Sequence, residues 1–401
     1  FDFLLENVNT VLALFHLRLI EKPFDVLLPV GISFYTFQAL SYTVDVFRGE
    51  IRAEKNPFRY ALFVSFFPQL VAGPIGRSGN LLRQICTVPQ TVKPDYREIT
   101  GGLTLMLWGL FLKMVVADRA AGVVDAVFAE HYLYQATALW AAALLFAVQI
   151  YCDFSSYSTI AVGAARVMGF SLMENFNTPY FAVSIRDFWR RWHISLSTWF
   201  RDYLYIPLGG NRAGRLRRYG NLMVTFLVSG LWHGASWNFV AWGGIHGLYQ
   251  IAGDLLAPWK RRFEKRFGVR TQCASYRLGQ ILVTFFLVDL AWVFFRADSL
   301  PAAADYLRRM FLRPDPWTLF DGSWYSWGLD IKETHVLLFG LFLLFLADLV
   351  RLRRGQRFDV FLEGECLWFR WAVILTLLFS TIVFGVYGID VSQIQFIYFQ
   401  F

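Results

Sequence analysis

Long apolar runs recur along the chain, separated by short polar and basic stretches. Several approach or exceed the roughly 18 residues that indicate a membrane-spanning helix. They predict membrane segments at residues 24–47, 59–74, 101–128, 136–152, 156–172, 219–252, 278–296, 335–350 and 369–388. The apolar positions are continuous rather than alternating, which argues against a transmembrane β-barrel. The pattern therefore predicts an all-α polytopic membrane protein, a bundle of transmembrane and re-entrant helices.

Two of these segments are expected to be re-entrant rather than spanning. Prolines and glycines interrupt the run 63–76, and the run 153–170 is rich in small residues suited to close helix packing. Re-entrant backbone is allowed in a membrane only where protein or a cavity covers it. We expect one membrane domain over residues 1–401, with no internal repeat.

Composition supports the membrane class. The 401 residues are 56% hydrophobic and 17% charged, whereas soluble chains are about 45–50% apolar and about 25% charged. The net charge of +8 comes from basic residues between the apolar runs. This distribution favours positive-inside topology over nucleic-acid binding.

Lys and Arg also set the expected orientation. The basic stretches 47–59, 186–218, 260–270 and 351–357 belong on the cytoplasmic side of the cell (inner) membrane. Residues 298–334 and the tail 392–401 then lie outside. For two basic stretches to flank 219–252 on one side, this segment must enter and return as a hairpin or broken helix, which its glycines permit.

The chain ends and the cysteines add little. The chain begins without an initiator Met or a signal-peptide pattern, so we expect that N-terminal helices are missing. The cysteines at positions 86, 152, 273 and 366 show no metal or disulfide spacing, and no role is assigned to them.

The most informative region is the Arg- and Trp-rich segment at about 175–218, expected to be cytoplasmic or interfacial. At helical spacing, Phe188, Trp192 and Trp199 form an aromatic stripe. One interpretation is an interfacial amphipathic helix. The other is a dock for an acidic cofactor, in which arginine forks and the "LGGNR" turn bind phosphate. Candidate donor-binding residues are Arg190, Arg191, Arg201, Arg212, Trp192 and Asn238, whereas Asp187 and Asp202 are expected to pair with arginines.

Three histidines lie in or near apolar sequence. His233 has Ser229, Ser236 and Asn238 as candidate orienting partners, whereas His246 is surrounded by apolar residues and glycines. An apolar surround favours the neutral imidazole, the form that a general base requires. Packing remains the alternative for both, and sequence physics leaves the role of His193 open. No Gly-x-Ser-x-Gly elbow, Cys/His pair or His-x-x-x-His spacing indicates a nucleophile or a metal.

Seven motifs in order resemble the membrane-bound O-acyltransferase family, and within it the bacterial alginate O-acetyltransferase-type branch. The resemblance spans about residues 28–401. The motifs are "LPVGISFYTFQALSYTVDVFRG", "FVSFFPQLVAGPI", "DFSSYSTIAVGAARVMGF", "ENFNTPY", "DFWRRWHISLSTWFRDYLYIPLGGNR", "GLWHGASWNFVAWGGIHG" and a terminal "FIYFQF".

The resemblance implies that His233, in "WHG", is the family's invariant catalytic histidine and that His193, in "RRWH", is its second functional position. It implies that both line a central tunnel, that acetyl-CoA is the donor with no bound cofactor, and that the acetyl group reaches an extracytoplasmic polysaccharide. The transfer would often pass through an SGNH-type partner acetyltransferase. His246 would have at most a supporting role.

Two alternatives stay open. Within the family, the chain could transfer D-alanine from an acyl-carrier protein to teichoic acid, because that branch shares the "RWH" and "WHG" wording. From another class, it could be a transporter, although no inverted repeat is visible, or a non-catalytic scaffold for an exported partner.

Overall fold

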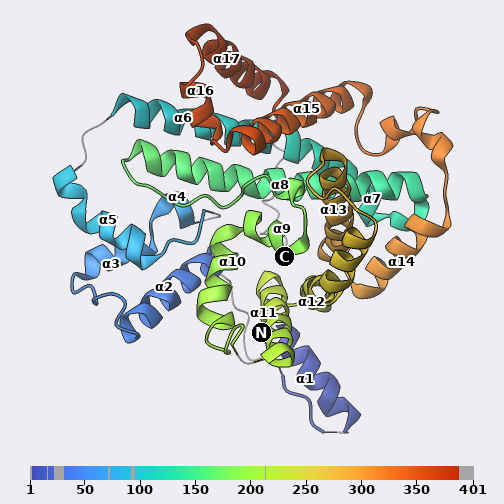
Figure 1. Cartoon of the computed structure of the whole chain (residues 1–401), viewed down its shortest axis with the longest axis horizontal. Helices are drawn as coiled ribbons and strands as arrows, with labels where there is room; N and C mark the ends of the chain where they lie inside the picture. Colours follow the sequence, from blue (N-terminus) through green and yellow to red (C-terminus); the bar gives the residue numbers. More distant parts are fainter. Residues whose placement is uncertain are drawn as a thin grey trace.

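A computed structural model describes residues 2–15, 17–21, 31–70, 73–91, 95–212 and 214–387. Every regular element in this part of the chain is a helix, which confirms the all-α prediction (Figure 1). The tail 392–401, expected on the outer face, lies outside the described residues.

Among the described helices, five are long and apolar enough to cross a membrane. The first is a continuous helix Tyr96–Ala129, made of α6 (Tyr96–Phe111), the π-helical turn η1 (Leu112–Ala117) and α7 (Asp118–Ala129). The others are α8 (Ala136–Val167), α13 (Ala274–Arg296), α15 (Ile331–Arg354) and α17 (Leu367–Phe384).

The remaining elements are shorter or more polar than these five helices. They are α1 (Asp2–Leu14), α2 (Ile32–Phe47), α3 (Pro57–Val64), α4 (Phe67–Leu70), α5 (Ser78–Thr91), α9 (Ile185–Arg191), α10 (Ile194–Phe200), α11 (Gly214–His233), α12 (Trp237–Arg266), α14 (Leu300–Leu312) and α16 (Phe358–Glu363), with the π-helical turn η4 (Arg201–Tyr205) and the 3-10 turns η2 (His131–Leu133), η3 (Pro179–Phe181), η5 (Pro316–Leu319) and η6 (Ser323–Ser326).

The long helix α8 is the centre of the fold. It packs along α6 and α7 and also contacts α13 and α14. Figure 1 shows α6 and α15 on one side of α8 and the α9–α12 region on the other. The contact with α6 is close because a side chain at Gly163 would begin 2.5 Å from the carbonyl oxygen of Gly102. Small residues therefore let these two helices approach backbone to backbone.

The prediction of two separate segments at 136–152 and 156–172, the second re-entrant, is wrong. The chain forms one helix from Ala136 to Val167. Its polar residues do not interrupt the helix because the protein supplies their partners: Asp153 lies 2.6 Å from the Lys113 ammonium, and the Ser156 hydroxyl donates to the Asp153 carbonyl. Buried polar groups with partners can remain inside a helix bundle.

The segment 59–74 is broken, as predicted. Helix α3 ends at Val64 and the single turn α4 begins at Phe67, with Pro68 in its first turn, where a missing N–H is tolerated. This part packs with α5 and α8 around a small second core.

The predicted hairpin at 219–252 is also present. Helix α11 ends at His233, three residues form the turn, and α12 begins at Trp237. The glycines of this segment were expected to permit the break between its two legs, but in the structure they have another role. A side chain at Gly230 would begin 2.2 Å from the Phe239 carbonyl oxygen, and one at Gly243 would begin 2.3 Å from that of Phe226. Glycine therefore allows the two legs to touch.

Three of the four basic stretches are linked by contacts, the third of them through Asn177. The Arg48 guanidinium lies 5.5 Å from the centre of the Tyr203 ring. Arg351 donates to the Asn177 side chain, and the Asn177 N–H donates to the Arg191 carbonyl. Parts of stretches 47–59, 186–218 and 351–357 therefore lie close together in the structure.

Candidate active site

His193 lies at a sharp break between α9 and α10. Its backbone is left-handed, with φ 42° and ψ 56°, a conformation that costs a non-glycine residue about 1 kcal/mol or more. The interpretation of this segment as one amphipathic helix with an aromatic stripe is therefore wrong: the chain turns after Trp192, and α10 starts in a new direction. The turn points the His193 side chain into the core, where it is fully buried.

The surroundings of His193 are aromatic apart from one amide. The Phe154 ring meets the imidazole edge to face at 4.6 Å, and Phe34 and Phe176 stack on it at 6.4 and 6.5 Å. The polar contact joins His193 Nδ1 to Asn175 Oδ1 at 3.1 Å. No hydrogen-bond partner for His193 Nε2 is found among the described residues.

His233 is the last residue of α11, and it is buried at the hairpin turn. Its ring meets Trp242 of the other hairpin leg at 5.0 Å and Phe295 of α13 at 5.4 Å, both edge to face. Close packing from three helices therefore fixes the position of this imidazole.

One indole ring connects the two histidines. Trp232 lies 6.2 Å from the His193 ring and 4.9 Å from the His233 ring, measured between centroids. The structure thus brings together the two residues for which the sequence predicts catalysis, although they are forty positions apart in the chain. Their chemical roles stay predictions.

His246 lies one helical turn beyond Trp242 in α12, and the Trp242 ring bridges it to His233, at 5.1 Å from the His246 ring and 5.0 Å from the His233 ring. It is fully buried, stacks on Phe188 at 6.2 Å, and accepts a hydrogen bond at 3.3 Å from the Trp189 indole N–H.

An arginine-lined cavity of about 590 Å³ lies between the α9–α10–η4 segment and the α11–α12 hairpin. Its charged walls are Arg186, Arg190, Arg201, Arg218 and Asp254. Asp254 accepts hydrogen bonds from both Arg186 and Arg218. The cavity therefore combines four guanidinium groups with a single carboxylate.

The cavity follows one face of α11 toward His233. Arg218, Leu222, Thr225 and Ser229 line it at the spacing of residues that share a helix face. His233 lies one turn beyond Ser229 on the same side of the helix. Neither His193 nor His233 lines the cavity, although Ile194, next to His193 in the chain, and Ser229, one turn before His233, do.

Some predicted donor-binding residues are in the cavity wall and others are not. Arg190 and Arg201 line it. Arg191 instead pairs with Asp187 at 3.0 Å, which confirms the expected pairing of that aspartate. Arg212 is exposed and lies outside the lining. The other expected pairing is also confirmed, because Asp202 lies 3.1 Å from Arg77 and 2.8 Å from Arg201.

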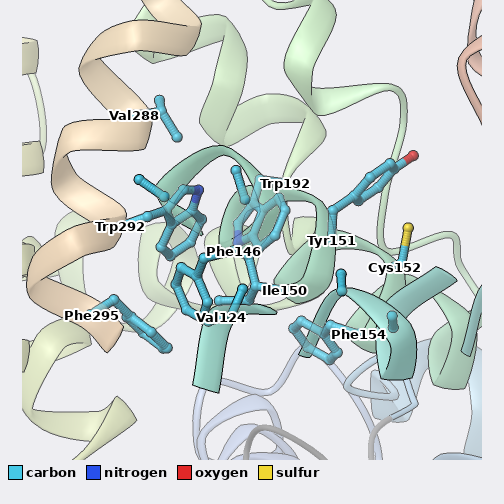
Figure 2. Close-up of a cluster of buried hydrophobic side chains, with 14 of the residues drawn as sticks. Val124, Phe146, Ile150, Tyr151, Cys152, Phe154, Trp192, Val288, Trp292 and Phe295 are labelled. Atoms are coloured by element: carbon cyan, nitrogen blue, oxygen red, sulfur yellow. The ribbon is translucent and has the colours of Figure 1, made fainter. Parts of the chain in front are cut away.

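Trp192 and Asn238 also have structural contacts instead of a place in the cavity wall. The Trp192 ring is buried in the core, 5.1 Å from Trp292, with Tyr151 and Ile150 nearby (Figure 2). The Asn238 amide donates to the Ala297 carbonyl and thereby ties the hairpin turn to the end of α13.

Four of the five backbone N–H groups of the "LGGNR" turn are used within the turn and are not available to an anion. The N–H groups of Leu208, Gly209, Gly210 and Arg212 all donate to carbonyls within residues 204–209. The turn has positive φ at both glycines, 109° and 51°, so glycine is needed for its shape.

Sequence reasoning missed Arg186, Arg218, Asp254 and Asn175. The two arginines belong to the basic stretch 186–218, but nothing in the sequence indicated that they share a cavity. Asp254 follows directly on an apolar run, and an acidic residue in such a place is a usable signal. Asn175 stands in the quoted motif "ENFNTPY" without a role assigned to it.

Comparisons with known proteins identify the family. Residues 19–288 match the model of the membrane-bound O-acyltransferase family. The chain is 41% identical over 313 residues to a probable alginate O-acetylase of Pseudomonas putida, a match covering 77% of this chain and 60% of that protein. It is 37% identical over 333 residues to a peptidoglycan O-acetyltransferase of Helicobacter pylori, with coverage of 77% and 60%.

A teichoic acid D-alanyltransferase of Bacillus subtilis is 25% identical over 256 residues, covering 61% of this chain and 63% of that protein. The match to the Pseudomonas putida protein, by comparison, spans 60% of that relative's length. The extent of the family match and the identity to these relatives show that the chain belongs to the membrane-bound O-acyltransferase family.

Proposed function

We propose that this chain acts in a membrane acyltransferase that takes an acetyl group from acetyl-CoA at the cytoplasmic face and passes it to a cell-envelope polysaccharide. The O-acetylase and O-acetyltransferase relatives support the acetyl group and the class of acceptor. The observation that carries the proposal is the arginine-lined cavity, which follows one face of α11 to within one turn of His233.

The cavity suits a phosphate-bearing donor. Four arginines and one aspartate line it, which leaves three positive charges if all are ionised. Guanidinium groups bind phosphate oxygens in bidentate geometry, and CoA carries several phosphates. The volume of about 590 Å³ lies within the range of about 300–1,000 Å³ typical of small-molecule sites. The donor's phosphates would lie among the arginines, and its thioester would reach along α11 toward the histidines.

His233 acts as the general base in this proposal. A hydroxyl oxygen of the acceptor bonds to the thioester carbonyl carbon while its proton passes to the His233 imidazole. The carbon–sulfur bond then breaks, and the sulfur takes the proton back from the His233 imidazolium to give CoA thiol and an O-acetyl ester. Because the thioester is already activated, the protein supplies mainly positioning and one proton transfer, the latter worth about 10²–10⁴-fold.

The path of the acetyl group beyond the membrane belongs to the same proposal. We place the protein in the inner membrane, with an extracytoplasmic SGNH-type acetyltransferase or the polysaccharide itself as the recipient. The positive-inside distribution of Lys and Arg supports this orientation, because it puts the arginine-lined cavity on the cytoplasmic side.

The test is transfer of labelled acetyl from acetyl-CoA by the whole protein in proteoliposomes. The wild type should transfer the label, and a His233→Ala variant that still inserts should lose it by about 10²-fold or more. Near-normal transfer by this variant would refute the role of His233. If the protein were instead a non-catalytic scaffold, the His233→Ala variant would leave acetylation of the polysaccharide in cells unchanged.

D-alanyl transfer is the second candidate, favoured by the similarity to the Bacillus subtilis D-alanyltransferase. Its 25% identity is lower than the 41% to the alginate O-acetylase, so acetylation is preferred. Offering the same preparation acetyl-CoA or a D-alanyl carrier protein separates the two, because each hypothesis predicts label from one donor only.

A further inference from the structure

We propose that Asn175 holds His193 in the tautomer that carries its proton on Nδ1, so that Nε2 presents a lone pair to a hydroxyl of the acceptor beside the one whose proton passes to His233. Asn175 is then a positioning residue, and His193 serves the acceptor rather than the thioester carbonyl. This inference rests on the proposed acyl transfer for its chemistry, but the tautomer itself follows from the hydrogen bonds around one buried amide.

The first step is the orientation of the Asn175 amide. Its Oδ1 lies 3.1 Å from the backbone nitrogen of Ser195. A backbone N–H can only donate, so the amide atom facing it must be the oxygen. The Ser195 hydroxyl donates to the same oxygen at 2.9 Å, and the amide nitrogen donates to the Ser158 hydroxyl at 3.2 Å. Turning the amide over would place donor against donor at the backbone contact.

The second step is the proton on His193. Asn175 Oδ1 lies 3.1 Å from His193 Nδ1, and a carbonyl oxygen only accepts hydrogen bonds. If Nδ1 were unprotonated, two lone pairs would face each other inside a buried, aromatic site, where no solvent screens them. Nδ1 therefore carries the hydrogen, and in the neutral ring Nε2 is an acceptor.

The third step is that the main chain locks this arrangement. The Asn175 carbonyl accepts from the Ile194 N–H at 2.9 Å, the residue directly after the left-handed turn at His193. Asn175 thus contacts three consecutive residues, 193–195, and it is itself 2% exposed. One side chain and its own backbone fix both the strained turn and the imidazole that the turn carries.

The chemical consequence separates two roles for His193. A neutral ring with a lone pair at Nε2 can accept a hydrogen bond from a hydroxyl next to the reacting one and so orient the acceptor, while the proton of the reacting hydroxyl passes to His233. The same ring has no hydrogen at Nε2 to donate to a thioester carbonyl. The structure therefore assigns His193 to the hydroxyl-bearing acceptor.

His246 provides an internal contrast. The Trp189 indole N–H, which can only donate, points to His246 Nδ1 at 3.3 Å. His246 must therefore carry its proton on Nε2. The two buried histidines are held in opposite tautomers, each by a partner whose own hydrogen-bonding role admits no alternative.

The experiment is ¹⁵N NMR of histidine-labelled full-length protein in lipid, because the two ring nitrogens have different shifts in the two tautomers. His193→Gln and His246→Gln assign the signals. We expect His193 as the Nδ1–H form and His246 as the Nε2–H form. A wild-type His193 signal of the Nε2–H form would overturn the proposal without any activity measurement.

Kinetics then test the positioning role. Asn175→Leu should lower kcat by about tenfold or more, as is usual when a group orienting a functional histidine is lost, and Asn175→Asp, which keeps an acceptor oxygen, should restore part of it. Ser195→Ala is the matched control, because it removes one donor to Oδ1 and leaves the His193 contact. An Asn175→Leu variant that keeps both its His193 tautomer and its kcat would refute the positioning role.

These outcomes are distinguishable from failure of the proposed function. If the wild type does not transfer acetyl from acetyl-CoA, the donor proposal fails while the NMR result still decides the tautomer. If Asn175→Leu does not fold, the wild-type spectrum and the comparison of Asn175→Asp with Ser195→Ala remain decisive.

Discussion

Asp254 on α12 accepts a hydrogen bond from Arg218 on α11 at 2.6 Å, an ion pair that joins the two hairpin legs inside the arginine-lined cavity. Asp254 also bonds to Arg186, and Arg201 pairs with the neighbouring aspartate. For Arg190 no ion pair is found in the described part of the chain. Among the cavity arginines, Arg190 therefore has the charge most available to a donor phosphate.

Replacing Arg190 should weaken donor binding. A charge-assisted hydrogen bond is worth about 1.5–3 kcal/mol, so Arg190→Gln is expected to raise the KM for acetyl-CoA by roughly tenfold or more, with a smaller effect on kcat. Arg212→Gln is the matched control, because Arg212 lies outside the cavity. Equal KM values for the two variants would contradict the placement of the donor phosphates.

The hairpin depends on close backbone contact at Gly230. A methyl group there would begin 2.2 Å from the Phe239 carbonyl oxygen, so Gly230→Ala must push the legs apart next to His233. We expect a loss of about 1–3 kcal/mol in stability, seen as a lower Tm in detergent, together with reduced transfer.

Gly253→Ala, in α12 of the same hairpin, is the control for this experiment. Nothing lies within 4 Å of the position a methyl group would take at Gly253. Alanine favours helix by up to about 1 kcal/mol over glycine, so this variant should keep or raise the Tm. A Gly230→Ala variant as stable as Gly253→Ala would show that the contact between the legs is looser than described.

The sequence predicts those features of the fold that depend on residues close together in the chain, and it does not predict those that depend on distant partners. Apolar run length predicted α13, α15 and α17, and the flanking basic stretches predicted the α11–α12 hairpin. The sequence could not predict that α8 continues through Asp153, because the partner that makes this possible, Lys113, is forty residues away in another helix.

The same distinction between local patterns and distant partners applies to the candidate active site. The family resemblance selected His193 and His233, and their meeting at Trp232 required the fold. The helical stripe suggested a surface role for Trp192, which the left-handed turn at His193 instead directs into the core. That turn depends on Asn175, eighteen residues upstream, so no local pattern indicates it.

The buried ion cluster around Lys113 should be essential for folding. Its ammonium lies 2.7 Å from Asp118 and 2.6 Å from Asp153, at the π-helical turn η1. Lys113→Met would leave two buried carboxylates without their cation, a change that costs roughly 3–5 kcal/mol in stability. We expect little folded protein by size-exclusion chromatography. Lys260→Met, which removes a half-exposed lysine 3.9 Å from Glu264, should be near neutral; comparable yields would contradict the importance of the cluster.

Cysteine labelling tests the orientation. Cys273 is exposed just before α13, and its contact with the Ser275 hydroxyl lowers the pKa of the thiol, so more of it is reactive thiolate at neutral pH. Burial raises the pKa of Cys86, which should label slowly.

With Cys366 replaced by serine, a membrane-impermeant maleimide should label Cys273 only in inverted vesicles, since 260–270 is expected inside. A second variant that also carries Cys273→Ser and Phe320→Cys, at a side chain 88% exposed between η5 and η6, should label only in right-side-out vesicles. Because α13 lies between the two positions, labelling of both from one side would mean that α13 does not cross the membrane. A reversed result would label Cys273 only in right-side-out vesicles and the Phe320→Cys site only in inverted vesicles. The arginine-lined cavity would then face away from cytoplasmic acetyl-CoA, and the donor proposal would fail.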